Sequence, residues 1–234
     1  MQLPLNLVTE GCKDFLQLDD VALNRLEKYA DLLVEWNKKF YLTAILDPEG
    51  IAVKHFFDCL MIFKYADIHT GASVIDIGTG AGFPGVVMKI ARPDINLTLM
   101  DSLAKRITFL KTLCGELGLE VTAIHSRAED ITPAQREGYD FAVARAVANM
   151  RVLTEYCLPF VKVGGSFIAM KGASAEEETA EAAKAISVLG GVLAKKDMFN
   201  LGDLGVRGII NVKKISQTST RYPRNPGKIS KQPL

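Results

Sequence analysis

Short apolar runs alternate with stretches of helical periodicity through most of this chain. Strands are expected at 73–77, 96–101, 120–125, 140–145 and 165–171, and further strands near 191–199 and 206–215. Helices are expected near 84–91, over 104–117 with Ser102 as cap, near 150–157 and over 175–189. This alternation predicts an α/β fold with a mostly parallel seven-stranded sheet and helices on both faces. The last two strands leave no room for a crossover helix, so they should pair antiparallel.

The residues before this alternating region are predicted to be helical. Asp19 or Asp20 can cap a helix over 21–40, in which apolar residues recur at helical spacing. Asp47 and Pro48 begin a second helix, which continues into a strongly apolar run. We therefore divide the chain into an N-terminal helical extension (1–70), a main domain (71–215) and a tail (216–234). The tail holds three prolines and no apolar periodicity, so it should be irregular unless docked.

Composition narrows the class of protein. The 234 residues contain no uncharged apolar run long enough for a membrane span, and no signal peptide is visible. The four cysteines and three histidines are scattered, so a metal site is not expected, and isolated cysteines fit a reducing cytoplasm. The net charge is +1, but from Leu204 onward there are seven basic residues and no acidic one. This asymmetry favours a polyanionic partner, although a solvated tail would look the same.

The stretch SVIDIGTGAGFPG (73–85) carries the clearest chemical signal. A buried strand, a glycine turn and a helix bring backbone close to a nucleotide-like ligand. Gly78 and Gly80 fit the dinucleotide fingerprint, but its third glycine falls on Phe83. Pro84 also removes an N–H donor that a pyrophosphate would use. These departures disfavour a nicotinamide oxidoreductase.

Two acids flank this turn. Asp76 ends the first strand, where it would repel phosphate and suit a cationic ligand. Asp101 ends the next strand, 19 residues after Gly82, and can accept hydrogen bonds from ribose hydroxyls. S-adenosylmethionine carries a sulfonium and an ammonium but no phosphate, so it is the favoured cofactor. A tight turn without any ligand remains the alternative.

Other polar residues follow the later strands and should reach the same edge of the sheet. Glu129 or Asp130 could bind an adenine amino group, although a surface acid is an equally good reading of the spacing. Arg145 ends the strand 140–145, and we favour a substrate or cofactor contact there over a structural ion pair. Lys171 is a similar but weaker candidate.

Several catalytic motifs are absent from the sequence. There is no Asn/Asp-Pro-Pro-aromatic element for amine methylation, and no Pro-Cys or Thr-Cys nucleophile for ring-carbon methylation. No histidine is obviously placed as a general base. This set fits a ring nitrogen with a free lone pair, such as guanine N7, for which positioning suffices and no catalytic residue is assigned.

The chain resembles the bacterial 16S ribosomal RNA (guanine-N7) methyltransferase G family, also called glucose-inhibited division protein B. The resemblance covers nearly the whole chain. It is carried by WNKKFYLTAI (36–45), HFFDCL (55–60), VIDIGTGAGFPG (74–85), DSLAKRITFL (101–110), SRAED (126–130), ARAVA (144–148), MKG (170–172) and RYPRNPGKISKQPL (221–234). It departs from the usual pattern at Tyr41, Cys59 and Ile229, which affects only the extension and tail.

The resemblance implies a Rossmann-like class I methyltransferase that acts in the cytoplasm. It implies methyl transfer from S-adenosylmethionine to N7 of one guanine in 16S ribosomal RNA. By resemblance, Gly78 and Phe83 line the cofactor, Ala128 and Glu129 hold its adenine side, and Arg145 completes the pocket. The basic tail, with Arg221, Arg224 and Lys228, would face RNA, and Lys171 is expected to help orient it.

We therefore expect a monomeric enzyme whose partner is 16S ribosomal RNA or the small ribosomal subunit, without membrane or metal. A small-molecule methyltransferase is one alternative, which the basic tail disfavours. A ribosome-binding protein with a vestigial cofactor site is another, which the intact glycines disfavour.

Overall fold

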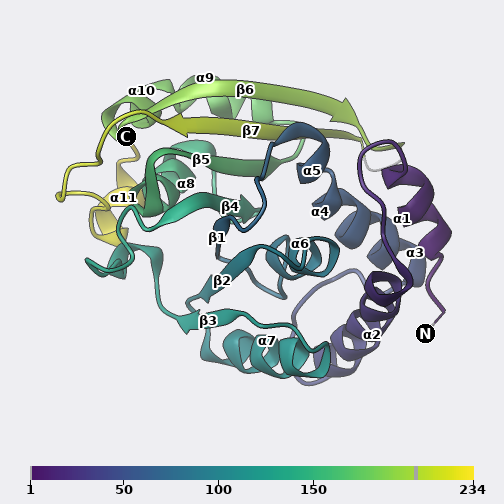
Figure 1. Ribbon diagram of the computed structural model, residues 1–234. Helices are drawn as coiled ribbons and strands as arrows, with labels where there is room; N and C mark the ends of the chain where they lie inside the picture. Colours follow the sequence, from purple (N-terminus) through teal and green to yellow (C-terminus); the bar gives the residue numbers. More distant parts are fainter. Residues whose placement is uncertain (1, 203–204) are drawn as a thin grey trace.

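A seven-stranded sheet forms the centre of the computed structural model, which describes residues 2–202 and 205–234 (Figure 1). Its strands are β1 (Ser73–Ile77), β2 (Asn96–Asp101), β3 (Thr122–His125), β4 (Tyr139–Arg145), β5 (Val161–Lys171), β6 (Gly191–Asn200) and β7 (Val206–Lys214). The spatial order is β3-β2-β1-β4-β5-β7-β6. The first five strands are parallel, and β7 is antiparallel to both β5 and β6. The predicted α/β class is confirmed.

Helices cover both faces of the sheet, as predicted. One face carries α6 (Gly85–Ala91) and α7 (Ala104–Glu116), and the other carries α8 (Met150–Cys157), α9 (Ala175–Glu181) and α10 (Ala183–Val188). Short 3-10 helices, η2 (Ala128–Asp130) and η3 (Leu158–Phe160), lie in the connections. Alternate residues of β1 enter the two cores: Val74 packs with α6 and α7, and Ile75 packs with α8.

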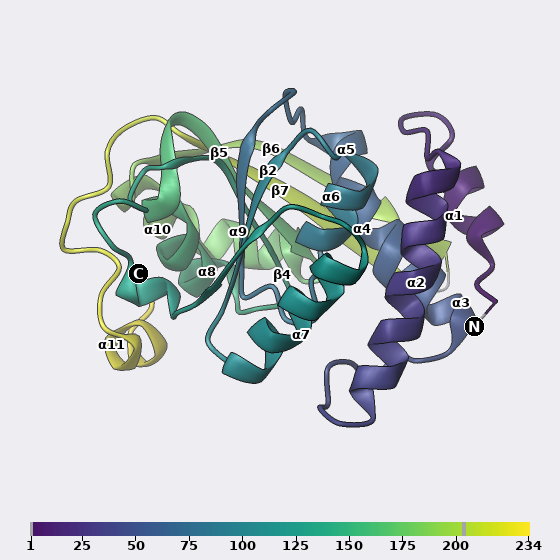
Figure 2. The ribbon, with the colours of Figure 1, turned by 60° about the horizontal axis from the view of Figure 1, so that its bottom comes forward.

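The extension is helical and packs beside α6 and α7 (Figure 2). It comprises α1 (Leu5–Cys12), α2 (Asp20–Asn37), α3 (Pro48–Gly50), a π-helix η1 (Ile51–Phe57), α4 (Asp58–Leu60) and α5 (Ile62–Tyr65). Asp19 caps α2 by accepting from the Ala22 N–H (2.8 Å), and Asp47 caps α3 by accepting from the Gly50 N–H (2.7 Å). Both predicted helix starts are confirmed, whereas α1 was not predicted.

The expected cap of α7 was wrong. Leu103, not Ser102, is the N-cap residue, and it makes no side-chain cap. Instead, the Asp101 carboxylate accepts from the Leu103 N–H (2.9 Å). The carboxylate that ends β2 therefore also fixes the entry to the following helix.

The tail is docked rather than irregular. It ends in α11 (Pro226–Lys231), whose Ile229 is buried, and Tyr222 is buried as well. Arg151 of α8 donates to the Leu234 carbonyl (2.7 Å), so the residues after α11 are held against α8. In the described part of the chain, no helix has the length and apolar character that a membrane crossing requires.

Candidate functional site

The glycine turn after β1 is pressed between two neighbouring segments. Gly78 has φ +70°, and a Cβ there would lie 2.8 Å from Val147 Cγ2. Gly82 has φ +102°, and a Cβ there would lie 2.7 Å from the Tyr29 hydroxyl oxygen. That hydroxyl donates to the Ala81 carbonyl (2.6 Å), so the extension holds the turn directly. Only glycine allows this conformation together with this close packing.

Asp76 lies beneath the turn and is fully buried. Its Oδ2 accepts from the Thr79 hydroxyl (2.7 Å) and from the Gly85 N–H (2.8 Å). Burial raises the pKa of this carboxyl to about 6. We expected Asp76 to face a cationic ligand. Only its Oδ2 is used in closing the turn, and its buried Oδ1 has no hydrogen-bond partner among the described residues, so a contact with the ligand stays a prediction.

Asp101 joins the turn to the end of β2. Its Oδ2 accepts from the Gly80 N–H (2.9 Å) and from Arg106 Nη1 (3.1 Å). Asp101 also accepts from the Leu103 N–H, so this one carboxylate connects the glycine turn with the start of α7. The predicted proximity of Asp101 to the glycines is confirmed.

A cavity of about 400 Å³, here called the glycine hollow, opens beside this turn. It is lined by Ile77, Gly78, Met100, Asp101, Ser102, Arg106, Ser126, Arg127, Ala128, Glu129, Ala146, Val147 and Tyr156. Four of the predicted cofactor residues, Gly78, Asp101, Ala128 and Glu129, thus meet in one cavity. Of the two acids left open by the sequence, Glu129 lines it and Asp130 does not.

Both acids of the glycine hollow have cationic neighbours. Arg106 pairs with Asp101 (3.1 Å), and Arg127 lies 3.7 Å from Glu129. The charges of Asp101 and Glu129 are therefore balanced within the chain. The cavity has the volume of a small-molecule site, and its carboxylates can accept from hydroxyl and amino groups. These residues fit the adenosine part of S-adenosylmethionine.

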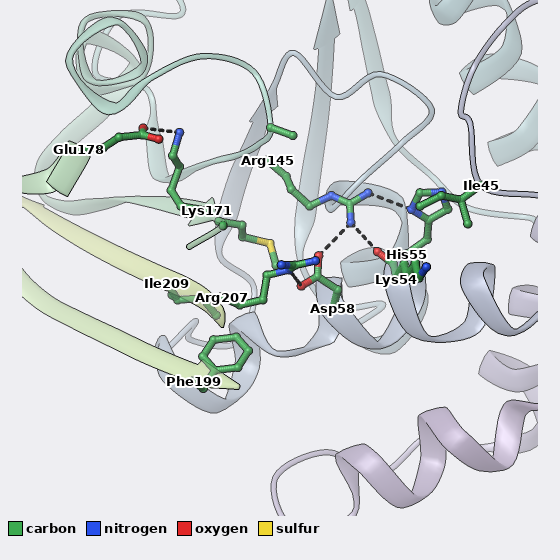
Figure 3. A pocket seen from close by; sticks show the side chains of 14 residues that line it. Ile45, Lys54, His55, Asp58, Arg145, Lys171, Glu178, Phe199, Arg207 and Ile209 are labelled. Atoms are coloured by element: carbon green, nitrogen blue, oxygen red, sulfur yellow. Dashed lines mark hydrogen bonds and ion pairs between the residues drawn. The ribbon is translucent and has the colours of Figure 1, made fainter. Parts of the chain in front are cut away.

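A second cavity of about 450 Å³, here called the arginine hollow, is drawn in Figure 3. It is lined by Ile45, Lys54, His55, Asp58, Arg145, Ala146, Met170, Lys171, Gly172, Glu178, Phe199, Arg207, Gly208 and Ile209. Ala146 lines both hollows, so they meet just after the end of β4. The carboxyl ends of β4 and β5, the start of β7 and the extension build its walls.

Arg145 is held by the extension. Its Nη1 donates to Asp58 Oδ2 (3.0 Å) and to the Lys54 carbonyl (3.0 Å), and its guanidinium lies 4.9 Å from the Phe83 ring centre. The structural ion pair that we disfavoured is therefore present, because the extension supplies the carboxylate that burial of this charge requires. Arg145 also lines the arginine hollow, so its contact with substrate or cofactor stays a prediction.

Phe83 lies on the side of the turn that faces the extension. Its ring stacks against Tyr29 (5.4 Å between centres) and against His55 (4.4 Å). The side chain is buried and does not line the glycine hollow, so the cofactor contact that the resemblance implies for it stays a prediction. In this structure Phe83 joins the glycine turn to the extension.

Lys171 lines the arginine hollow at the end of β5, but it is partly buried and paired. Its ammonium lies 2.6 Å from Glu178 Oε2 and donates to the Ala148 carbonyl (2.7 Å). A direct RNA contact by Lys171 therefore stays a prediction.

The predicted RNA-facing residues of the tail separate into two groups. Arg224 is fastened to Glu155 of α8, which is fully buried, through Nη2–Oε2 (2.6 Å) and Nε–Oε1 (2.8 Å) contacts. The expectation that Arg224 faces RNA is corrected, because it neutralises a buried carboxylate. Arg221 lies over the Tyr222 ring (4.9 Å), and both Arg221 and Lys228 are exposed.

Asp58 and Arg207 are site residues that the sequence argument missed. Asp58 is an acid inside the apolar run IAVKHFFDCLMIF, and a buried acid needs a cationic partner. This signal was available but does not name the partner. Arg207 was counted only as one of the basic residues near the end of the chain.

No group of three or more His, Cys, Asp or Glu side chains within residues 2–202 and 205–234 could hold a metal ion. The four cysteines are buried and free.

Solved structures share this fold at low sequence identity. A methyltransferase from Pyrococcus furiosus matches with a TM-score of 0.58 and 15% identity, over 82% of this chain and 99% of that one. A variant of a 16S rRNA (adenine(1408)-N(1))-methyltransferase from Catenulisporales acidiphilia, solved with the cosubstrate SAM, matches with a TM-score of 0.55 and 14% identity, over 64% and 88%. These likenesses establish a Rossmann-like methyltransferase fold.

Sequence relatives are much closer. A ribosomal RNA small subunit methyltransferase G from Clostridium botulinum is 48% identical over 98% of both chains. A protein of the same name from Desulforamulus reducens is 50% identical over 89% of this chain and 88% of that one. The family profile described as rRNA small subunit methyltransferase G matches residues 22–203. Because this profile covers most of the chain and these relatives are about half identical to it, the chain belongs to the ribosomal RNA small subunit methyltransferase G family.

Proposed function

We propose that this protein transfers a methyl group from S-adenosylmethionine to N7 of a guanine in 16S ribosomal RNA. Membership of the family gives the reaction class. The observation that carries the proposal is the meeting of the glycine hollow and the arginine hollow at Ala146. One cavity suits an adenosine ligand, and the other is wide enough for a base and is lined by cations.

The glycine hollow is the donor site in this proposal. S-adenosylmethionine supplies an electrophilic methyl group on a sulfonium. Gly78 lets the backbone approach the ligand, Asp101 accepts from the ribose hydroxyls, and Glu129 with the backbone of Ala128 binds the adenine. The hydrogen-bond capacity of Asp101 is not exhausted, since each carboxylate oxygen has two lone pairs.

No proton has to leave guanine N7 before it reacts, because this atom carries a free lone pair. The site fits that requirement. The histidine of the arginine hollow, His55, has its pKa lowered to about 4 by burial and by Arg145, and both ring nitrogens have partners in the chain. The residues of the hollow therefore act by binding and orienting the base.

The lining of the arginine hollow favours an anionic substrate. Lys54, Arg145, Lys171 and Arg207 outnumber the two acids there, Asp58 and Glu178. RNA phosphates fit this excess of positive charge better than an uncharged metabolite does. Arg221 and Lys228 of the tail are exposed and add two further cations that phosphates can reach. The substrate is 16S ribosomal RNA, alone or within the small subunit.

The test is incubation of the protein and labelled S-adenosylmethionine with small ribosomal subunits that lack the modification, followed by mapping of the methylated base. We expect the label on one guanine, and the RNA chain should be open to chemical cleavage at that nucleotide, as it is where guanine carries an N7-methyl group. Label on a free metabolite, or on another atom of the RNA, would contradict the proposal.

Two neighbouring acids provide a matched pair of variants for the donor site. Glu129 lines the glycine hollow and Asp130 does not. Glu129→Gln should weaken donor binding by about tenfold or more, because it removes a charge-assisted hydrogen bond. Asp130→Asn should change it by less than about twofold. Equal effects in calorimetry would place the donor elsewhere.

A further inference from the structure

The proposed function leaves two motifs of the extension, at 36–45 and 55–60, without a role. In the structure the second motif contacts Arg145 through His55 and Asp58, and the first is joined to it through the hydrogen bond between Thr43 and His55. Asp58 places its carboxylate between two guanidinium groups, with Oδ2 3.0 Å from Arg145 Nη1 and Oδ1 3.5 Å from Arg207 Nε (Figure 3). The two arginines come from β4 and β7, so one carboxylate of the extension joins both strands at the arginine hollow.

His55 lies on the other side of Arg145 and adds no charge. Its Nδ1 is 3.3 Å from Arg145 Nη2. Since a guanidinium only donates, Nδ1 is the acceptor, and Nε2–H donates to the Thr43 hydroxyl (2.9 Å). That hydroxyl also accepts from the Ile45 N–H (3.1 Å), which fixes the loop before α3. A pKa of about 4 keeps His55 neutral near pH 7.

Asp58 therefore supplies the charge that balances Arg145. Among the described residues, it is the one carboxylate in contact with that guanidinium. Asp76 is within electrostatic range, since Arg145 lowers its pKa, but its hydrogen-bonding oxygen is turned to Thr79 and Gly85.

The position of this cluster matters because the donor is a cation. Arg145 is followed directly by Ala146, where the two hollows meet. For methyl transfer the sulfonium has to face the arginine hollow near this junction. A guanidinium without a counter-ion in such a buried place would repel the sulfonium.

We propose that Asp58 is a positioning and charge-balancing residue, which holds Arg145 and Arg207 on the wall of the arginine hollow and lets the cationic donor bind beside them. This inference rests on the proposed function, because it assumes S-adenosylmethionine in the glycine hollow. The extension is then a part of the methyl-transfer site.

The test compares two ligands that differ in charge. S-adenosylmethionine carries the sulfonium, and S-adenosylhomocysteine has a neutral sulfur in its place. For Asp58→Asn, we expect calorimetry to show the Kd of S-adenosylmethionine rising about tenfold and that of S-adenosylhomocysteine changing less than about threefold. A purely structural role would weaken both ligands alike, and that outcome would overturn the inference.

Asp140→Asn is the matched control. Asp140 lies in the same strand β4, but at its opposite end, where it pairs with Lys162 (3.1 Å) and accepts from Ser73. This variant also removes one paired carboxylate. It should leave the ratio of the two dissociation constants unchanged. A change equal to that of Asp58→Asn would mean that the net charge of the protein, and not the position of Asp58, determines the ratio.

Removing the guanidinium of Arg145 as well should reverse the change that Asp58→Asn makes in the ratio of the two dissociation constants. In the double variant Asp58→Asn with Arg145→Gln, the ratio of the two dissociation constants should return to within about threefold of the wild-type ratio. Without such recovery the inference is overturned. If Asp58→Asn does not fold, Arg145→Gln alone decides, since it leaves Asp58 paired with Arg207 and should shift the ratio in favour of S-adenosylmethionine.

The proposed function and this inference can fail separately. A wild-type protein that binds neither ligand would contradict the proposed donor site. A wild-type protein that binds both, with a ratio that no variant changes, would contradict only the role of Asp58.

Discussion

At the scale of single residues, Asp76 shows how the site and the stability of the fold are linked. Its carboxyl is buried under the glycine turn, and burial raises its pKa from 3.8 to about 6. Between these two pH values the folded state binds a proton that the unfolded state has lost. The contribution of Asp76 to folding is therefore full below about pH 4 and decreases as the pH rises through 6.

We predict that Asp76→Asn removes this decrease. The asparagine oxygen can still accept from Thr79 and Gly85, while no charge forms under the turn. The free energy of unfolding of the variant, relative to wild type, should rise by about 2.5 kcal/mol between pH 4 and pH 7. Urea denaturation over this pH range measures it. A difference that stays constant with pH would contradict the assignment.

At the scale of elements, the tail and α8 form one unit. Glu155 is fully buried in α8, and Arg224 of the tail is its ion-pair partner. Arg221, three residues earlier, is exposed and only lies over the ring of Tyr222. Two arginines of the same basic segment therefore have different tasks, one in docking the tail and one on the surface.

This difference gives a prediction with two measurements. Arg224→Ala should lower the free energy of unfolding by about 3 kcal/mol or more, because it leaves a buried carboxylate unpaired. Arg221→Ala should change it by less than about 1 kcal/mol. In RNA binding the order reverses, and Arg221→Ala should reduce the slope of log K against log salt by about one. Equal stability losses in urea would contradict the docking role.

The elements themselves were largely predictable, since local signals specify them. Strand β1 is a β-branched run, and Asp19 and Asp47 have the residue type that caps a helix. The partners of Arg145 were not predictable. Asp58 is 87 residues away in the chain, and their pairing depends on how the extension packs against the sheet. The same holds for Phe83, whose ring direction is set by Tyr29 and His55.

At the scale of the whole molecule, the extension and the sheet share a core. Tyr29, Leu33 and Phe56 of the extension belong to the same buried cluster as Val86 of α6 and Phe109 of α7. A second cluster on the opposite face contains α8 and the buried Tyr222 of the tail. The division at residues 70 and 215 thus follows the chain order, but neither boundary separates one core from another.

Shared burial of this kind predicts that the extension and the sheet unfold together. Trp36, the one tryptophan of the chain, lies in α2 and contacts Phe109 of α7 with ring centres 5.6 Å apart. Its fluorescence reports on the joint between extension and sheet, whereas far-ultraviolet circular dichroism reports on all elements. The two signals should give the same midpoint in urea, because removing α2 would expose the apolar face of α7. A fluorescence transition at clearly lower urea would mean that the extension detaches first, and the Asp58 carboxylate would then leave the arginine hollow before the sheet unfolds.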